Sequence, residues 1–80
     1  MSAHIGNNQK QKTLMYKALE SKYTAEASEA LATMNVYLNN PAGIGEHPQV
    51  IEELAKQLEK LANAEDALNT LKENQKTLMS

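Results

Sequence analysis

The chain lacks several of the residue types that most often build a chemically specific site. None of its 80 residues is cysteine, which excludes disulfides and thiolate metal ligands. Arginine is absent too, and the eight lysines against ten acidic residues leave a net charge of −2. So mild a charge does not favour binding to nucleic acid or to an anionic membrane. Phenylalanine and tryptophan are also missing, so few bulky side chains can fill a core.

Long hydrophobic runs are missing as well. No segment approaches the ~20 apolar residues that cross a bilayer, and residues 1–12 contain no hydrophobic segment of the signal-peptide type. The sequence therefore predicts a cytoplasmic protein that does not associate with membranes.

Glycine and proline are absent from two long segments, and this absence predicts two helices. Neither residue occurs in 9–38 or in 49–79, and Pro48 suits the first position of a helix. We predict a flexible N-terminal arm over residues 1–8 and a single domain over 9–80. That domain comprises a helix at 9–38, a loop at 39–47 and a helix at 48–79.

Apolar residues recur every three or four positions in both segments, which is the spacing of one helix face. The mean spacing is close to the ~3.5 residues of a left-handed coiled coil. In the first segment the stripe comprises Tyr16, Leu19, Tyr23, Ala27, Ala30, Met34 and Tyr37, and in the second Ile51, Leu54, Leu58, Leu61, Ala64, Leu68, Leu71 and Leu78.

The two stripes match when the chain is folded back about the loop. If the position numbers of two facing residues add up to about 88, Met34 faces Leu54, Ala30 faces Leu58, and Tyr16 lies near Leu71. Large residues then repeatedly meet small ones, as close helix packing requires. The sequence therefore predicts an all-α fold, an antiparallel helical hairpin of two long coiled-coil-like helices.

Several apolar residues lie beside this seam. They are either ordinary surface scatter or a second seam that docks another copy into a helical bundle. We favour a homo-oligomer, most simply a dimer, because two helices of this size bury little area. The residues concerned are Leu14, Met15, Leu31, Leu38, Ala55, Ala62 and Ala67.

The loop is a candidate partner-binding site. Most of it has a structural explanation: Pro41 ends the first helix, Gly43 and Gly45 allow positive φ, and Glu46 favours the start of the second helix. His47 is not a preferred helix cap, and the loop is longer than a tight turn needs. A corner is favoured over a site. The candidate residues are Asn39, Asn40, Gly43, Ile44, Gly45, Glu46 and His47.

Other chemistry is sparse. His4 and His47 are the only histidines, with no His-x-x-x-His or Glu-x-x-His spacing to hold a metal on a helix. Gly43-Ile44-Gly45 lacks the Gly-Lys-Ser/Thr ending of a phosphate loop, and no nucleophile has a histidine at helical spacing. We therefore predict no catalytic residue, cofactor or metal, and a non-enzymatic interaction or assembly module. The alternative is a small-ligand or metal-binding protein that uses the Gly-Ile-Gly-Glu-His loop.

One motif supports a resemblance. The segment "NNPAGIGEHP" between two helical segments resembles a pattern in short uncharacterised proteins of tailed bacteriophages, T4-like and marine phages among them. The resemblance covers about residues 16–71, and its specific element is the hexapeptide from Gly43 to Pro48. It implies a small helical phage accessory protein in the host cytoplasm, and it carries no catalytic residue across.

Substitutions in the loop distinguish a purely structural corner from a binding site. For a corner, Gly43→Ala or Gly45→Ala should cost on the order of 1 kcal/mol of unfolding free energy, since a Cβ disfavours positive φ. His47→Ala and Glu46→Ala should cost less, roughly half a kcal/mol, as surface substitutions do. Thermal melts of the four variants, with and without a candidate metal, measure this. A metal-induced rise in melting temperature that His47→Ala abolishes would establish a site instead.

Overall fold

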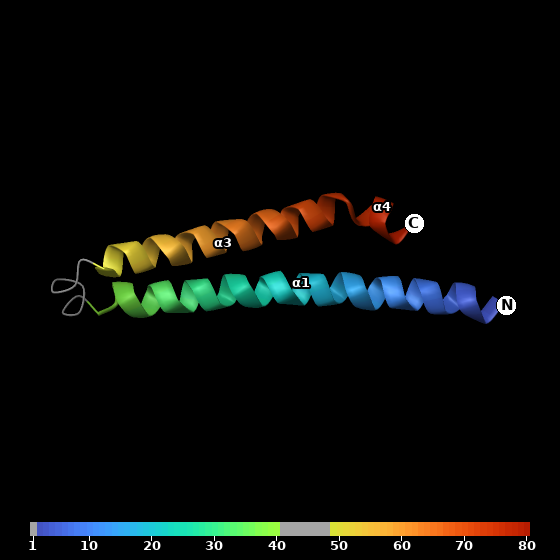
Figure 1. The fold of residues 1–80 in the computed structure, drawn as a ribbon, viewed down its shortest axis with the longest axis horizontal. Helices are drawn as coiled ribbons and strands as arrows, with labels where there is room; N and C mark the ends of the chain where they lie inside the picture. Colours follow the sequence, from blue (N-terminus) through green and yellow to red (C-terminus); the bar gives the residue numbers. More distant parts are fainter. Residues whose placement is uncertain (1, 41–48) are drawn as a thin grey trace.

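A computed structural model describes the backbone of residues 2–40 and 49–80, and the side chains of residues 9–40 and 49–80. The described residues form helices α1 (Ser2–Leu38), α3 (Gln49–Glu73) and α4 (Gln75–Met79), and none of them lies in a strand. Figure 1 shows α1 and α3 running antiparallel beside each other, with both ends of the chain at the same end of the molecule. The predicted all-α hairpin is confirmed.

The helix α1 starts earlier than the sequence suggests. It begins at Ser2, whereas the pattern places the start of the helix at Gln9. Gly6, Asn7 and Asn8 are weak helix formers, but propensity is only a weak determinant of where a helix begins. The backbone of residues 2–8 continues α1, so that this end extends past the C-terminus (Figure 1).

The predicted end of the first helix agrees with the structure. The helix α1 ends at Leu38, and the amide of Asn39 still donates to the Asn35 carbonyl at 3.0 Å. The amide of Asn40 donates instead to the Tyr37 carbonyl, three residues back, at 3.3 Å. This tightening of the last turn is a common way to close a helix, and the proline that follows prevents further extension.

The second helix is interrupted at Asn74 rather than continuous to Met79 as predicted. The Asn74 side-chain amide donates to the Thr70 carbonyl at 2.8 Å, and its backbone amide donates to the same oxygen at 3.1 Å. With φ −103° and ψ 10°, Asn74 leaves the helical region, as asparagine does when its side chain competes for backbone groups. Beyond it, the Lys12 Nζ donates to the main-chain oxygen of Ser80 at 2.8 Å, which connects this end to α1.

The core is thin. Among the described side chains only Ala30, Val50 and Ala64 are buried, with exposed fractions of 0%, 8% and 1%. The molecule measures 65 × 18 × 15 Å, with a radius of gyration of 18.5 Å against roughly 12 Å for a compact domain of this length. Its exposed area is 6306 Å², against roughly 4,800 Å² for a compact monomer of the same mass. The hairpin is a single layer of two helices with a narrow seam.

Part of the predicted stripe on the second helix is wrong. Ile51 and Leu58 were expected to face α1, but they are 65% and 55% exposed. Leu19 and Leu78 are also about half exposed. Along α3 one set of less exposed positions is spaced by four and three residues, and it comprises Val50, Leu54, Gln57, Leu61, Ala64, Leu68 and Leu71. Glu53, Lys60 and Ala67, beside this set, are also partly buried. Because Leu54 and Leu61 belong to both the predicted and the observed stripe, α3 near the loop is turned from the predicted orientation by roughly half of the ~100° between successive residues.

The close approach of the helices can be tested at Ala30. Ala30→Leu should cost about 1–3 kcal/mol of unfolding free energy, because the added atoms overpack a fully buried position. Ala32→Leu, at an exposed position of the same helix, should change it by no more than about 0.5 kcal/mol. Urea unfolding at one fixed chain concentration measures both. Equal effects of the two substitutions would show that the helices do not pack closely at Ala30.

Candidate functional site

The loop that offers a candidate partner-binding site, and that is predicted chiefly as a corner, lies largely outside the described residues. Gly43, Ile44, Gly45, Glu46 and His47 all fall in that segment, so a loop site stays a prediction. The remaining candidates, Asn39 and Asn40, are exposed at the end of α1. The Asn39 side-chain amide donates to Asn35 Oδ1 at 2.8 Å, and none of the described residues has a positive φ. Both asparagines therefore have a helix-ending role.

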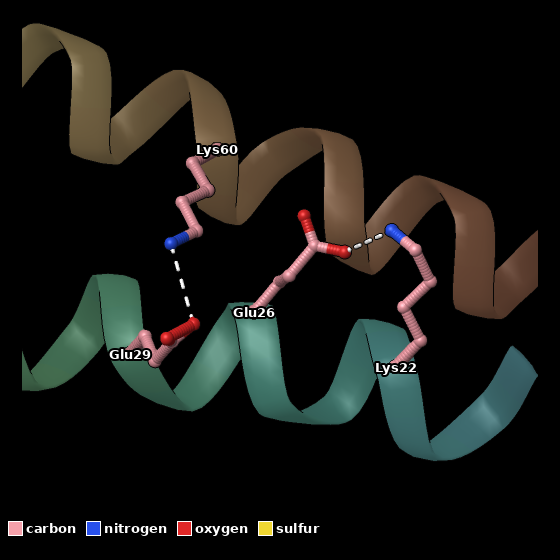
Figure 2. Close-up of polar contacts among 4 residues, drawn as sticks. All are labelled: Lys22, Glu26, Glu29 and Lys60. Atoms are coloured by element: carbon pink, nitrogen blue, oxygen red, sulfur yellow. Dashed lines mark hydrogen bonds and ion pairs between the residues drawn. The ribbon is translucent and has the colours of Figure 1, made fainter. Parts of the chain in front are cut away.

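One side of the hairpin carries its ion pairs. The Lys60 Nζ extends from α3 toward Glu29 on α1, 3.4 Å from its Oε1 (Figure 2). Along α1, the Lys22 Nζ lies 2.7 Å from Glu26 Oε2, and on α3 the Lys56 Nζ lies 3.8 Å from Glu53 Oε2. We call this surface the charged side; it comprises Lys22, Glu26, Glu29, Glu53, Lys56 and Lys60.

Of these three pairs only Glu29–Lys60 joins the two helices; the other two lie within α1 and within α3. Lys22 donates a hydrogen bond to Glu26, and this bond, together with the carboxylate charge, raises the pKa of the lysine above its usual value. The ammonium also lies 4.7 Å from the centre of the Tyr23 ring. Because Lys22 is exposed to solvent, which screens its charge, the pair contributes little to stability. The bridge between Glu29 and Lys60 instead fixes which turns of α1 and α3 lie at the same level.

The other side of the hairpin is apolar in the half nearest the loop. Residues 30–38 of α1 include no charged side chain, and the charges in the first half of α3 fall at 52, 53, 56, 59 and 60. On this side both helices carry large apolar side chains that remain exposed. They are Leu31 (54%) and Leu38 (59%) on α1, and Ile51 (65%) and Leu58 (55%) on α3. The apolar side, as we define it, comprises Ala27, Leu31, Met34 and Leu38 of α1 with Ile51, Leu54, Leu58 and Leu61 of α3.

Helix geometry places these two stripes on the same side of the molecule. On α1, Leu31 follows the buried Ala30 and so lies about 100° further around the helix. On α3, Ile51 follows the buried Val50 in the same rotational sense. Because the helices are antiparallel and face each other, the same rotation from the seam leads to the same side of the hairpin on both. The stripes therefore form one continuous surface.

Toward the termini, open grooves follow the seam on each side. The apolar side continues into a groove of about 620 Å³, whose walls carry Glu20 on α1 and Lys72 on α3. Within it, the Tyr16 hydroxyl donates to the Leu71 carbonyl at 3.4 Å, as the predicted proximity of these residues requires. A second groove, of about 460 Å³, lies on the opposite side and is lined by Leu19, Tyr23 and other residues of all three helices.

The described side chains offer little beyond apolar contact and surface ion pairs. Among residues 9–40 and 49–80 no three His, Asp or Glu side chains gather closely enough to hold a metal ion, and no buried polar side-chain atom lacks a partner. Within the same part of the chain, no helix combines the length and apolar character needed to cross a membrane.

Comparisons with protein-family models, with curated proteins and with solved structures find no match to this chain.

Sequence reasoning identified half of the apolar side. It placed Leu31 and Leu38 beside the seam, where the structure finds them exposed. It missed Ile51 and Leu58, because their spacing also fits a stripe facing α1. The signal that could have found them is the charge pattern of α3, which leaves these positions on the side away from Glu52, Lys56 and Glu59.

The bridge between the helices gives a measurable prediction. In a double-mutant cycle of Glu29→Gln and Lys60→Gln, the coupling should be about 0.2–1 kcal/mol, as for exposed pairs. It should fall toward zero at about 1 M salt, where charges a few ångströms apart are screened. Urea unfolding of the four proteins measures the coupling. Glu59→Gln, at an exposed position next to Lys60 on the same helix, should show no coupling to Glu29→Gln. Zero coupling of Glu29 with Lys60 at low salt would indicate a different helix register.

Proposed function

We propose that this protein is a non-enzymatic helical interaction and assembly module whose copies associate through exposed apolar helix surface. The observation that supports this is the apolar side, where four large aliphatic side chains are each more than half exposed on a surface without charge. Contiguous exposed apolar surface of this kind typically marks a protein–protein contact.

The energies suit reversible association. Burying a leucine or isoleucine completely contributes roughly 1.5–3 kcal/mol, so a half-exposed side chain still has on the order of 1 kcal/mol to gain. Two copies supply eight such side chains. Their summed gain is comparable to the roughly 4–15 kcal/mol of lost translational and rotational freedom on association. The balance favours a complex whose population depends on concentration.

The resemblance of residues 16–71 to tailed-phage proteins fits this role. A helical accessory protein in a host cytoplasm would act by binding proteins rather than by catalysis. We propose that setting for the chain on the sequence pattern alone. The described residues add an exposed apolar surface suited to helical partners.

Self-association is directly measurable. Sedimentation equilibrium of the wild-type chain should show a dimer or higher oligomer at micromolar concentration, with dissociation on dilution. The physical reason is the large apolar area left exposed by the single hairpin. A mass near 9 kDa at every concentration up to roughly 1 mM would contradict the proposed assembly. Only binding weaker than about 4 kcal/mol escapes detection at that concentration.

A further inference from the structure

We propose that the apolar side is covered by a second copy of this chain, related to the first by a two-fold axis parallel to the long axis of the hairpin. This inference rests on the proposed function and specifies its surface and geometry. In the resulting four-helix bundle, α1 of one copy packs against α3 of the other. All neighbouring helices are then antiparallel, as in common up-down bundles.

The apolar side is the surface best suited to this contact. The charged side already has its lysines paired with glutamates, and covering it would remove those charges from water at a cost. Other exposed apolar residues near the loop end, such as Val36 at 67%, stand outside the apolar side. In the half of the hairpin nearest the loop, and among the described residues, only the apolar side draws large exposed aliphatic side chains from both α1 and α3, so it is as wide as the hairpin there.

The register of the two helices makes this surface self-complementary. Within one chain, residues at the same level have position numbers that add up to about 88, because Glu29 pairs with Lys60 and the Tyr16 hydroxyl bonds to Leu71. A two-fold axis along the hairpin preserves these levels between copies. Leu31 then lies level with the partner's Leu58, and Leu38 lies level with the partner's Ile51, so large exposed side chains meet across the interface.

The area that a stable dimer needs favours this axis over a two-fold axis perpendicular to the long axis of the hairpin. The apolar stretch of α1, residues 27–38, is about 17 Å long at ~1.5 Å per residue. On a hairpin 18 Å wide, it gives a footprint of only about 300 Å², well below the ~800 Å² per partner of a typical interface. If the two-fold axis instead crossed the apolar side perpendicular to the long axis of the hairpin, the two copies would overlap over little more than that area. A parallel axis aligns the full 65 Å length, including the groove beside Tyr16.

The exposed area of the single chain is sufficient for such a contact. The hairpin exposes 6306 Å², which is roughly 1,500 Å² more than a compact protein of its mass. Covering about 800 Å² of each copy, as a typical interface does, would remove about half of that excess. The dimer then has a core of two layers of helices, where the single chain has only a seam.

Matched lysine substitutions test the surface. In sedimentation equilibrium on the full chain, Leu31→Lys should raise the dimer dissociation constant at least tenfold, because it places a charge on each half of an apolar interface. Val36→Lys, on the same helix and similarly exposed, should change it less than threefold. Circular dichroism checks that both variants stay helical. Equal weakening by the two substitutions, or a larger effect at Val36, would overturn the inference.

Cysteine pairs test the axis, and the chain has no native cysteine to interfere. Under mild oxidation with copper phenanthroline, a mixture of Leu31→Cys chains and Leu58→Cys chains should form the mixed disulfide. A mixture of Val36→Cys and Leu58→Cys chains should form at least tenfold less. Efficient linking of Asn35→Cys chains to themselves, with little mixed product from Leu31 and Leu58, would show a perpendicular axis and overturn the geometry.

The outcomes separate this inference from the proposed function. If the wild-type chain associates but neither Leu31→Lys nor the mixed disulfide responds as expected, the inference fails while assembly through another surface stands. If the wild-type chain is monomeric at all concentrations, the proposed assembly fails and this geometry fails with it.

Discussion

The close contact of α1 and α3 at Ala30 and Ala64 is the feature on which the rest of the structure depends. These are the two most completely buried of the described side chains, and both are alanines. Their small size lets the helices approach closely, but it also means that little apolar area is hidden. A helix that packs against one neighbour can cover only one stripe of its surface. The apolar residues of this chain occupy a wider arc than that.

The unlike sides of the hairpin follow from this limit. Near the loop, α3 packs with Val50 and Gln57 toward α1 and leaves Ile51 and Leu58 exposed. The same orientation brings Lys60 within 3.4 Å of Glu29, where its aliphatic stem can cover the edge of the seam while the ammonium stays in water. One side of the molecule thus takes the charges, and the other keeps the remaining aliphatic side chains.

A protein built this way is suited to binding through surfaces. Its grooves are open, its ion pairs are exposed, and the apolar side exposes aliphatic side chains that a second layer of helices would bury. Interfaces of obligate dimers resemble a domain core cut in half, and the apolar side has that composition over the half of the hairpin nearest the loop. On this view, self-association would complete the fold, and contact with other helical proteins would use the same physical forces.

The sequence by itself determined the helices, their antiparallel pairing and the residue at which α1 ends. Long segments free of glycine and proline, matching stripes, and the Asn-Pro step after Leu38 are local signals, and local signals are read directly from a sequence. Only the tertiary structure decided which face of α3 meets α1. The competing faces differ by a single residue, Val50 against Ile51, and apolar character alone favours the wrong one, because Leu58 is more apolar than Gln57. The choice depends on where α1 lies, and the location of the apolar side follows from it. The break at Asn74 is also beyond simple periodicity, because it depends on a side-chain hydrogen bond to Thr70 that competes with the helix.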